Sequence, residues 1–237
     1  VLNGCIGMGT IGMVGDGASP NKYLIGLEVI KKLGGFGIPI FKPRAFNLDI
    51  IKRFKAAEDA GAVAVGIDID AASFRTMTLK GQAVGPKTIA ELQELKSHLK
   101  VPFILKGIMN VQSALAAIEA GADAIVVSNH GGRVMDHMPG TAEVLPGIAN
   151  AVGGRVKVLV DGGIREGIDI LKMLALGADA VMIGRPVCIA AFGAGQEGVS
   201  FYLQEKLNEL KKAMILTGCG SIGRIDPSII FRKKGDR

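Results

Sequence analysis

The stretch Ser128-Asn129-His130-Gly131-Gly132-Arg133 places an imidazole, two glycines and a guanidinium directly after an apolar run at residues 124–127. An imidazole with its ordinary pKa of about 6.5 can accept a proton at neutral pH, so His130 is the natural candidate for a general base. Arg133 can clamp a substrate carboxylate through two parallel hydrogen bonds. The two glycines let the chain turn back, so we expect both side chains to face one pocket.

Two other apolar runs end in groups that suit the same chemistry. Asp70 follows the run at residues 63–69 and could accept a hydrogen bond from one ring nitrogen of His130, which would orient the ring and stabilise the imidazolium. Lys106 ends the run at residues 101–106, where a lysine needs an anion or another polar partner. We therefore expect His130, Asp70 and Lys106 to form a catalytic group.

A third pair of segments has the composition of a phosphate site. Residues 161–165 read Asp-Gly-Gly-Ile-Arg, and residues 183–186 read Ile-Gly-Arg-Pro. Glycines let the backbone approach a ligand and direct its N–H groups toward it. Arg165 and Arg185 could each hold phosphate oxygens in a fork. Together the two segments predict that a phosphate group binds there.

These residues must be positioned by a repeating pattern of strands and helices. Residues 58–65, 119–126 and 175–182 each end a helical pattern with a glycine and then begin a short apolar strand. A second kind of strand lies between the copies, and helical patterns join the two kinds. One of these helices opens at a capping box, Thr88-Ile89-Ala90-Glu91.

Strands that are apolar throughout indicate a parallel sheet buried on both faces. Four double units would give eight strands and a (β/α)8 TIM barrel, in which chemistry lies at the carboxyl ends of the strands. Seven strands are expected, numbered 2 to 8 of the barrel, at residues 5–14, 37–42, 63–69, 101–106, 124–128, 156–161 and 180–184. We expect strand 1 and the N-terminal region to be absent from this chain. An open, doubly wound sheet is the alternative.

The composition narrows the class of protein. The chain has 237 residues, 49% of them hydrophobic, and a net charge of +6, which suits an anionic cofactor or substrate. The sequence holds no apolar run of the roughly 20 residues that cross a membrane, and no basic stripe interleaved with aromatics as nucleic-acid binding requires. The three cysteines are scattered without metal-ligand spacing. We expect a cytoplasmic protein with neither a metal site nor a nucleic-acid partner.

Four motifs carry a family resemblance: Leu105-Lys106-Gly107-Ile108, residues 128–133, residues 161–165 and residues 183–186. Together and in this order they resemble the FMN-dependent α-hydroxy acid oxidases and dehydrogenases, the group of glycolate oxidase, lactate oxidase and flavocytochrome b2. The resemblance is strong from about residue 100 to 225 and weaker before it. It implies one FMN-binding (β/α)8 barrel domain over residues 1–237, and a homotetramer.

The resemblance also implies roles. His130 would act as base at the substrate α-carbon with Asp70 orienting it, and Arg133 would bind the substrate carboxylate. Lys106 would lie beside N1 and O2 of the flavin and stabilise its reduced, anionic form. The remaining FMN contacts would come from Ser128, Asp161, Gly162, Gly163, Arg165, Gly184 and Arg185.

Two departures from the family pattern concern the substrate side. The usual Thr-x-Asp of strand 4 is Asp68-Ile69-Asp70 here, and the strand 3 tyrosine that helps to bind the substrate carboxylate is absent. The chain's two tyrosines, Tyr23 and Tyr202, lie in helical patterns instead. We take Lys42, at the end of strand 3, as the candidate that replaces the tyrosine.

The sequence thus predicts an FMN-dependent enzyme that oxidises a small 2-hydroxy acid to the 2-oxo acid, with the flavin as electron acceptor. One alternative is another FMN-barrel enzyme, such as a type 2 isopentenyl diphosphate isomerase. Binding a diphosphate substrate would require more basic residues near the flavin than this chain offers. A second alternative is a flavin-binding barrel without catalysis, which the joint presence of His130, Arg133, Lys106 and Asp70 opposes.

Overall fold

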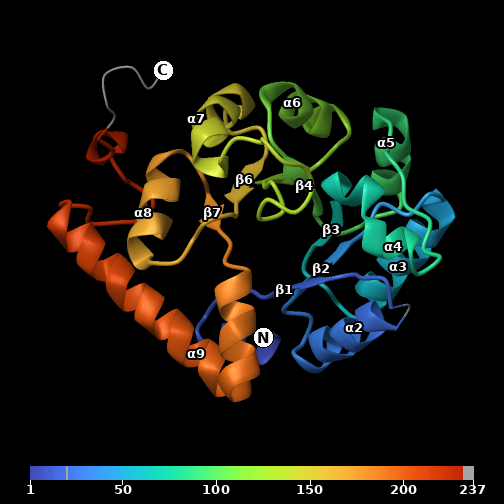
Figure 1. Ribbon diagram of the computed structural model, residues 1–237, viewed down its shortest axis with the longest axis horizontal. Helices are drawn as coiled ribbons and strands as arrows, with labels where there is room; N and C mark the ends of the chain where they lie inside the picture. The colour runs from blue at the N-terminus through green and yellow to red at the C-terminus, as the bar shows by residue number, and fades with distance from the viewer. Residues whose placement is uncertain (20, 232–237) are drawn as a thin grey trace.

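Seven parallel strands form a curled sheet with the helices arranged outside it (Figure 1). The computed structural model describes residues 1–19 and 21–231. The strands are β1 (Met13–Gly15), β2 (Ile38–Phe41), β3 (Val65–Asp68), β4 (Phe103–Ile108), β5 (Ala124–Val127), β6 (Lys157–Val160) and β7 (Ala180–Val181). Each strand pairs in parallel with the next one along the chain. A doubly wound sheet would reverse its strand order at a switch point, so the predicted barrel arrangement is confirmed.

Helices follow the strands in alternation. They are α1 (Leu2–Gly7), α2 (Lys22–Lys32), α3 (Asn47–Asp59), α4 (Arg75–Thr78), α5 (Ile89–Ser97), α6 (Val111–Glu119), α7 (Thr141–Val152), α8 (Gly167–Ala175) and α9 (Arg185–Leu216), with 3-10 turns η1 (Ile69–Ser73) and η2 (Pro227–Ile229). The predicted capping box opens α5, because Thr88 and Glu91 make both of its hydrogen bonds. Helix α9 is interrupted at Ala194 and Gly195, and its two arms diverge visibly in Figure 1.

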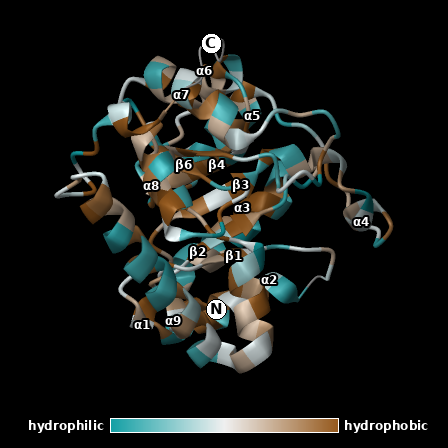
Figure 2. Cartoon of the chain, turned by 60° about the vertical axis from the view of Figure 1, so that its left-hand side comes forward, coloured by the Kyte–Doolittle hydropathy of each residue, from teal (hydrophilic) through white to brown (hydrophobic). Residues whose placement is uncertain are grey.

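Apolar side chains pack on both faces of the sheet. Outside it, Phe41, Phe54 and Phe103 are fully buried between strands and helices, with ring centroids 6.1 and 5.9 Å apart. Inside it, a smaller cluster combines one or two residues from successive strands, among them Ile40, Ile104 and Val126. Figure 2 shows the hydrophobic colouring concentrated on the strands and on the helix faces turned toward them. The alternation of inner and outer residues explains why the strands read as continuously apolar.

The prediction for the first strand, residues 5–14, is wrong over most of its length. Residues 2–7 form helix α1, which lies beside α9 (Figure 2), and only Met13–Gly15 join the sheet. Leu2 and Cys5 are three residues apart and both buried, which is helical spacing. Gly4 lets the two helices approach, since a Cβ there would lie 2.7 Å from Val199 of α9.

The other predicted strands agree to within two or three residues. The last of them, expected at residues 180–184, is the shorter strand β7, because Gly184 already caps α9. The glycines predicted to end helical segments do follow α3, α6 and α8, and they have positive φ of 79° at Gly61, 83° at Gly121 and 106° at Gly177.

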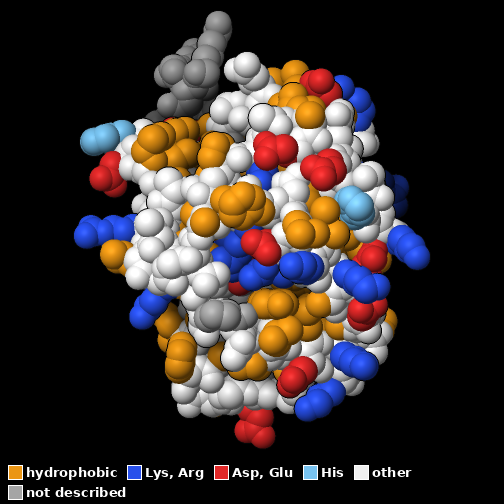
Figure 3. All heavy atoms as spheres, turned by 90° about the vertical axis from the view of Figure 1, so that its right-hand side faces the viewer, with side chains coloured by type: hydrophobic (Ala, Val, Ile, Leu, Met, Phe, Trp, Pro, Cys, Tyr) orange, Lys and Arg blue, Asp and Glu red, His pale blue; other side chains and the backbone are white. Residues whose placement is uncertain are grey.

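The outer surface mixes charges of both signs. Exposed ion pairs join Lys96 to Asp123 and Lys157 to Asp179. On the face shown in Figure 3, basic side chains gather near the middle with acidic and hydrophobic ones among and around them. In residues 1–19 and 21–231, no helix combines the length and the apolar character that a bilayer crossing demands.

The tightest backbone contact at the amino ends of the strands generates a stability prediction. Gly35 has φ of 92°, and a Cβ there would lie 2.1 Å from the carbonyl oxygen of Gly61. Gly34 has φ of 67°, but a Cβ there would meet nothing within 4 Å. We expect Gly34→Ala to cost about 1 kcal/mol of unfolding free energy and Gly35→Ala roughly 3 kcal/mol, because only the second adds a clash to the backbone strain. Urea unfolding measures both, and equal losses would contradict the role of the contact.

Candidate active site

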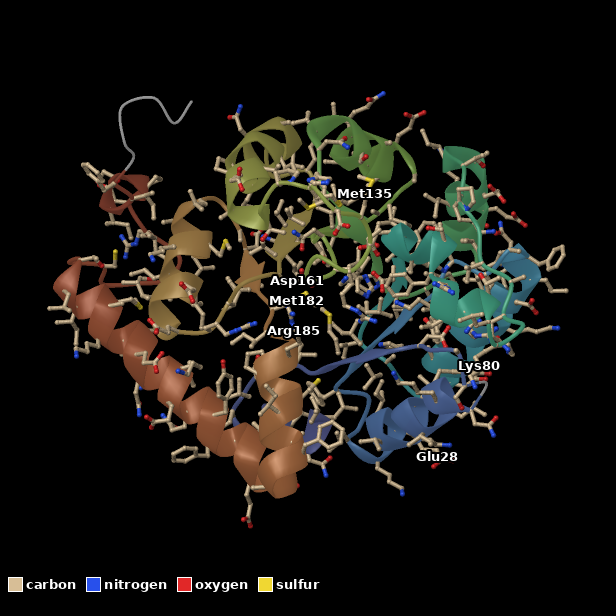
Figure 4. The ribbon with its side chains drawn as sticks, in the orientation of Figure 1. Glu28, Lys80, Met135, Asp161, Met182 and Arg185 are labelled. Atoms are coloured by element: carbon tan, nitrogen blue, oxygen red, sulfur yellow. The ribbon has the colours of Figure 1, made fainter. Side chains whose placement is uncertain are left out.

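A cavity of about 650 Å³ lies at the carboxyl ends of the strands, within the size range of small-molecule sites. Figure 4 shows Asp161, Met182 and Arg185 near the centre of the molecule, where β6, β7 and α9 meet, whereas Glu28 and Lys80 lie at the periphery. The cavity brings together many of the residues predicted from the sequence: Lys106, His130, Arg133, Asp161, Gly162, Gly163, Arg165, Gly184 and Arg185.

His130 is placed by the turn that follows β5. Its backbone is left-handed, with φ of 57°, which is unusual for a residue with a side chain and is characteristic of functional sites. The Ser128 hydroxyl oxygen accepts a hydrogen bond from the His130 N–H at 3.1 Å. The Asn129 side-chain oxygen accepts from the N–H groups of Gly131 and Gly132. These local bonds turn the chain sharply and put His130 in the wall of the cavity.

Asp70, in the 3-10 turn after β3, holds the imidazole. Nδ1 of His130 lies 3.1 and 3.2 Å from the two carboxylate oxygens of Asp70, so the predicted contact is present. Gly107 makes room for it, because a Cβ there would lie 2.6 Å from the Cβ of Asp70. With Nδ1–H donating to Asp70, Nε2 is the ring nitrogen left to accept a proton.

Asp68 is a second carboxylate in the same cluster, and the sequence analysis did not assign it a role. Its oxygens lie 2.5 Å from Nζ of Lys42, 3.1 Å from Nζ of Lys106 and 3.4 Å from Nδ1 of His130. All three charged residues of this set, Lys42, Asp68 and Lys106, are buried. The signal that could have revealed the contact is sheet register, because Asp68 lies opposite Lys106 and Lys42 directly follows the strand on the other side.

Burial and neighbouring charges both shift the pKa values of the groups around His130, in most cases in opposite directions. Burial alone would lower the pKa of His130, but hydrogen bonds to Asp68 and Asp70 outweigh it and raise that pKa. Burial and the charge of Asp68 raise the pKa of Asp70. Burial raises the pKa of Asp68, but His130 and the two lysines outweigh it, and the net pKa is far below the ordinary value. The neighbouring carboxylates likewise overcome burial and raise the pKa of Lys106. The structure therefore raises the affinity of the His130 imidazole for a proton and favours the ionised forms of Asp68 and Lys106.

Phe74 is a further site residue that the sequence did not indicate. Its ring packs edge-on against the His130 ring, with centroids 4.6 Å apart. Nζ of Lys42 lies 4.8 Å and the guanidinium carbon of Arg133 5.4 Å from the centre of the same ring. Aromatic faces attract cations over such distances. Phe74 thus connects the base to the arginine expected to bind the substrate.

The opposite side of the cavity has the features of an FMN site. Asp161 lines the cavity, and its buried Oδ1 atom is an acceptor whose hydrogen-bonding capacity no donor among the described residues satisfies. A Cβ at Gly163 or Gly184 would meet nothing within 4 Å, which leaves the backbone open to a ligand. Arg165 and Arg185 are exposed at the cavity, and each donates a single side-chain hydrogen bond within residues 1–19 and 21–231, which leaves N–H groups for an anion. Open glycine backbone, two guanidiniums and an unpaired acceptor fit the phosphate and ribityl groups of FMN.

The remaining predicted residues lie behind the cavity wall. Ser128 is fully buried, Asp70 contacts His130, and the ammonium group of Lys42 is bound by Asp68. Potential ligand atoms of Asp68, Asp70 and His130 also lie within 4.8 Å of one another, as in a metal site. Two ammonium groups already bind Asp68, however, so the charge that a metal ion would supply is present in the side chains themselves.

Comparison with known proteins agrees with this geometry. Residues 76–232, more than half of the chain, match the model of the FMN-dependent dehydrogenase family. The chain belongs to that family. FMN is the cofactor for which the family is named, and the donors described above are suited to it.

Relatives of this family member include several oxidases of hydroxy acids. This chain is 37% identical to the 4-hydroxymandelate oxidase of Amycolatopsis orientalis over 84% of its own length and 66% of that protein. It is 50% identical to a 2-hydroxyacid oxidase of Dictyostelium discoideum over 60% of this chain and 36% of that protein. The L-lactate oxidase of Lactobacillus jensenii is 41% identical over 74% of this chain and 40% of that protein. The chain thus spans between about a third and two thirds of these relatives.

Solved structures agree with the fold. A crystal structure of mandelate oxidase superposes with a TM-score of 0.84 at 33% identity, over 95% of this chain and 71% of that chain. A mandelate oxidase variant with a monooxide FMN adduct superposes with a TM-score of 0.83 at 36% identity and the same coverage. The match supports the barrel-type assignment of the seven-stranded sheet.

The raised pKa of His130 generates a prediction for stability against pH. A histidine whose folded pKa lies above its unfolded value of about 6.5 adds stability that is complete below that value and is lost as pH rises through the folded pKa. The difference in unfolding free energy between the native protein and His130→Gln should therefore fall as pH rises from about 6 to 8. Urea unfolding at a series of pH values measures it. A difference that stays constant or grows over this range would contradict the stabilised imidazolium.

Proposed function

We propose that this protein is an FMN-dependent oxidoreductase that converts a small 2-hydroxy acid to the 2-oxo acid, within one domain over residues 1–237. The observation that carries the proposal is the imidazole of His130, held at Nδ1 by Asp70 and sharing one cavity with Arg133 and Lys106. A base, a carboxylate clamp and a buried cation are the groups that this reaction needs. The named activities of the relatives support the same class of reaction.

His130 moves the proton. Nε2 faces away from Asp70 and accepts a proton from the substrate carbinol, while Asp70 and Asp68 stabilise the imidazolium that results. The hydrogen bond at Nδ1 also fixes the ring orientation and its tautomer before the substrate arrives. The strained backbone of His130 is held by Ser128, so the base does not need to reorganise during the reaction.

Arg133 binds the substrate. Its guanidinium lies over the Phe74 ring, lines the cavity and can form two parallel hydrogen bonds with a carboxylate. Phe74 also contacts the His130 ring, so it sets the spacing between the carboxylate site and the base. Because Arg133 and His130 line the same cavity, one molecule can offer a carboxylate to the first and a hydroxyl to the second, as a 2-hydroxy acid does.

Lys106 and the two arginines hold the cofactor. When bound, the flavin of FMN takes up the two electrons that leave the substrate carbon. Lys106, kept charged by Asp68 and Asp161, provides the positive charge beside the flavin that favours its reduced form. Arg165, Arg185 and the backbone at Gly163 and Gly184 bind the phosphate end. Arg165 and Arg185 would thus hold the phosphate end of FMN, and Lys106 would hold its ring end in the cavity that His130 also lines.

The phosphate part of this proposal predicts different effects on two flavins. Arg185→Met removes charge-assisted hydrogen bonds, each worth about 1.5–3 kcal/mol, so the Kd for FMN should rise roughly 10- to 100-fold. Riboflavin lacks the phosphate, so its Kd should stay within about twofold. Quenching of flavin fluorescence measures both, and Arg155→Met, whose side chain bonds only to the end of α7, is the matched control. An equal loss of riboflavin affinity would contradict a phosphate role for Arg185.

The catalytic part predicts reduction of the bound flavin by substrate. Anaerobic mixing of the FMN-loaded protein with a panel of 2-hydroxy acids should bleach the flavin absorbance with at least one of them. His130→Gln should slow the bleaching about 10²- to 10⁴-fold, the usual effect of losing a general base. His98→Gln, at the end of α5, is the matched control and should bleach at the native rate. Flavin that no hydroxy acid bleaches would favour an isomerase-like or purely flavin-binding protein instead.

A further inference from the structure

Three side chains from neighbouring strands form a buried row of alternating charge beside the base. Lys42 follows β2, Asp68 ends β3, and Lys106 lies opposite Asp68 on β4. One Asp68 oxygen binds Lys42 at 2.5 Å, and the other binds Lys106 at 3.1 Å and lies 3.4 Å from Nδ1 of His130. The side chains of Lys42, Asp68 and Lys106 are 8%, 6% and 10% exposed, so water screens these charges very little.

Such a row cannot be an incidental surface feature. A buried ammonium group without an anion is costly, and Asp68 is the anion that Lys42 binds. Lys42 does not line the cavity among the described residues, although the sequence suggested it as a partner of the substrate carboxylate. Its connection to the reaction runs through Asp68 instead. The position of Asp68 is also the one at which the family pattern described above has threonine, whose hydroxyl carries no charge.

We propose that Lys42 and Asp68 form a positioning pair in which Asp68 holds Lys106 toward the flavin side and acts as a second carboxylate partner of His130, while Lys42 balances the charge of Asp68. The proposal rests on the function proposed above. In this arrangement the two members act on the base in opposite directions. Asp68 favours the imidazolium form of His130, and Lys42 limits that effect by neutralising part of the Asp68 charge.

The other charged side chains near His130 come from different strands, turns and helices. Asp70 approaches from the turn after β3, and Lys106 from β4. Arg133 approaches Phe74 from the loop after β5, and Arg185 at the start of α9 donates to the carbonyl of Gly131. Asp161, after β6, contacts Lys106. Substituting Lys42 or Asp68 leaves all five of these residues in the chain, but Lys106 and Asp70 interact directly with Asp68 and respond to its loss. The Lys42 variant, whose lysine forms its ion pair with Asp68, therefore tests the pair with the smaller disturbance of these groups.

The test measures the titration of His130 directly. The chain contains three histidines, so labelling with ¹³Cε1-histidine gives three side-chain resonances, and His130→Gln assigns the one of interest. In the FMN-loaded protein, Asp68→Asn should lower the midpoint of the His130 titration by about one pH unit. Lys42→Met should raise it by roughly half a unit, because Lys42 lies one side chain further away. The double variant should titrate between the two.

A matched control and a second readout make the test specific. Lys157, like Lys42, pairs with an aspartate, but the Lys157–Asp179 pair is exposed. Lys157→Met should therefore leave the midpoint of the His130 titration unchanged. The affinity of the bound flavin for sulfite reports positive charge beside the flavin. It should change at least about threefold in Asp68→Asn, since Lys106 loses a partner that holds it. If Lys42 and Asp68 only stabilised the fold, their substitution would not shift the His130 midpoint in opposite directions and would not change the affinity for sulfite.

The outcomes separate the inference from the proposed function. Midpoints that move in the same direction in Asp68→Asn and Lys42→Met, or that do not move, would overturn the positioning pair. Opposite shifts in a protein that no hydroxy acid reduces would keep the pair and overturn the proposed reaction. If Asp68→Asn fails to fold with a buried unpaired lysine, Lys42→Met and the double variant, which removes both charges, still decide the sign.

Discussion

The carboxylate of Asp68, bound on both sides by an ammonium group, is the contact on which the rest of the site depends. Parallel strands bring their carboxyl ends to one edge, so a lysine at the end of β2 and another on β4 converge with no solvent between them. Neither cation could stay charged and buried without the anion between them. Once the three are paired, Lys106 has a defined position at the cavity, and His130 has two carboxylates to orient it. The arrangement of the pocket thus depends on the pairing of buried charges at the carboxyl ends of the strands.

Local backbone features complete what the sheet begins. A left-handed His130, tied down by Ser128, directs the imidazole into the cavity, and Gly107 lets the Asp70 turn approach the neighbouring strand. Phe74 then fills the space between the base and Arg133. On the other side, glycines after β6 and β7 leave the backbone exposed next to two arginines. The cavity is therefore divided between a buried, charge-paired half around His130 and an exposed half with two arginines that suits an anionic cofactor.

Much of this could be predicted from the sequence, and the failures have physical causes. The repeat of helix, glycine and apolar strand gave the barrel order, because each of these signals is local. The grouping of Lys106, His130, Arg133 and Asp161 followed from strand ends sharing one edge. The first strand failed because residues 2–7 are apolar enough for either structure, and packing against α9 decides for a helix. Asp68 and Phe74 were missed because their roles depend on contacts with residues up to 62 positions away along the chain, which a local sequence pattern does not reveal.

The close approach of Gly35 and Gly61 occurs at the amino ends of β2 and β3, at the far end of the strands from the cavity. The molecule therefore keeps this tight backbone contact and its candidate catalytic side chains at opposite ends of the same sheet. Loops at the reactive end can change in length and composition without disturbing that contact. This separation allows substitutions at the cavity end to change which ligands bind, while the contact at the other end continues to stabilise the fold.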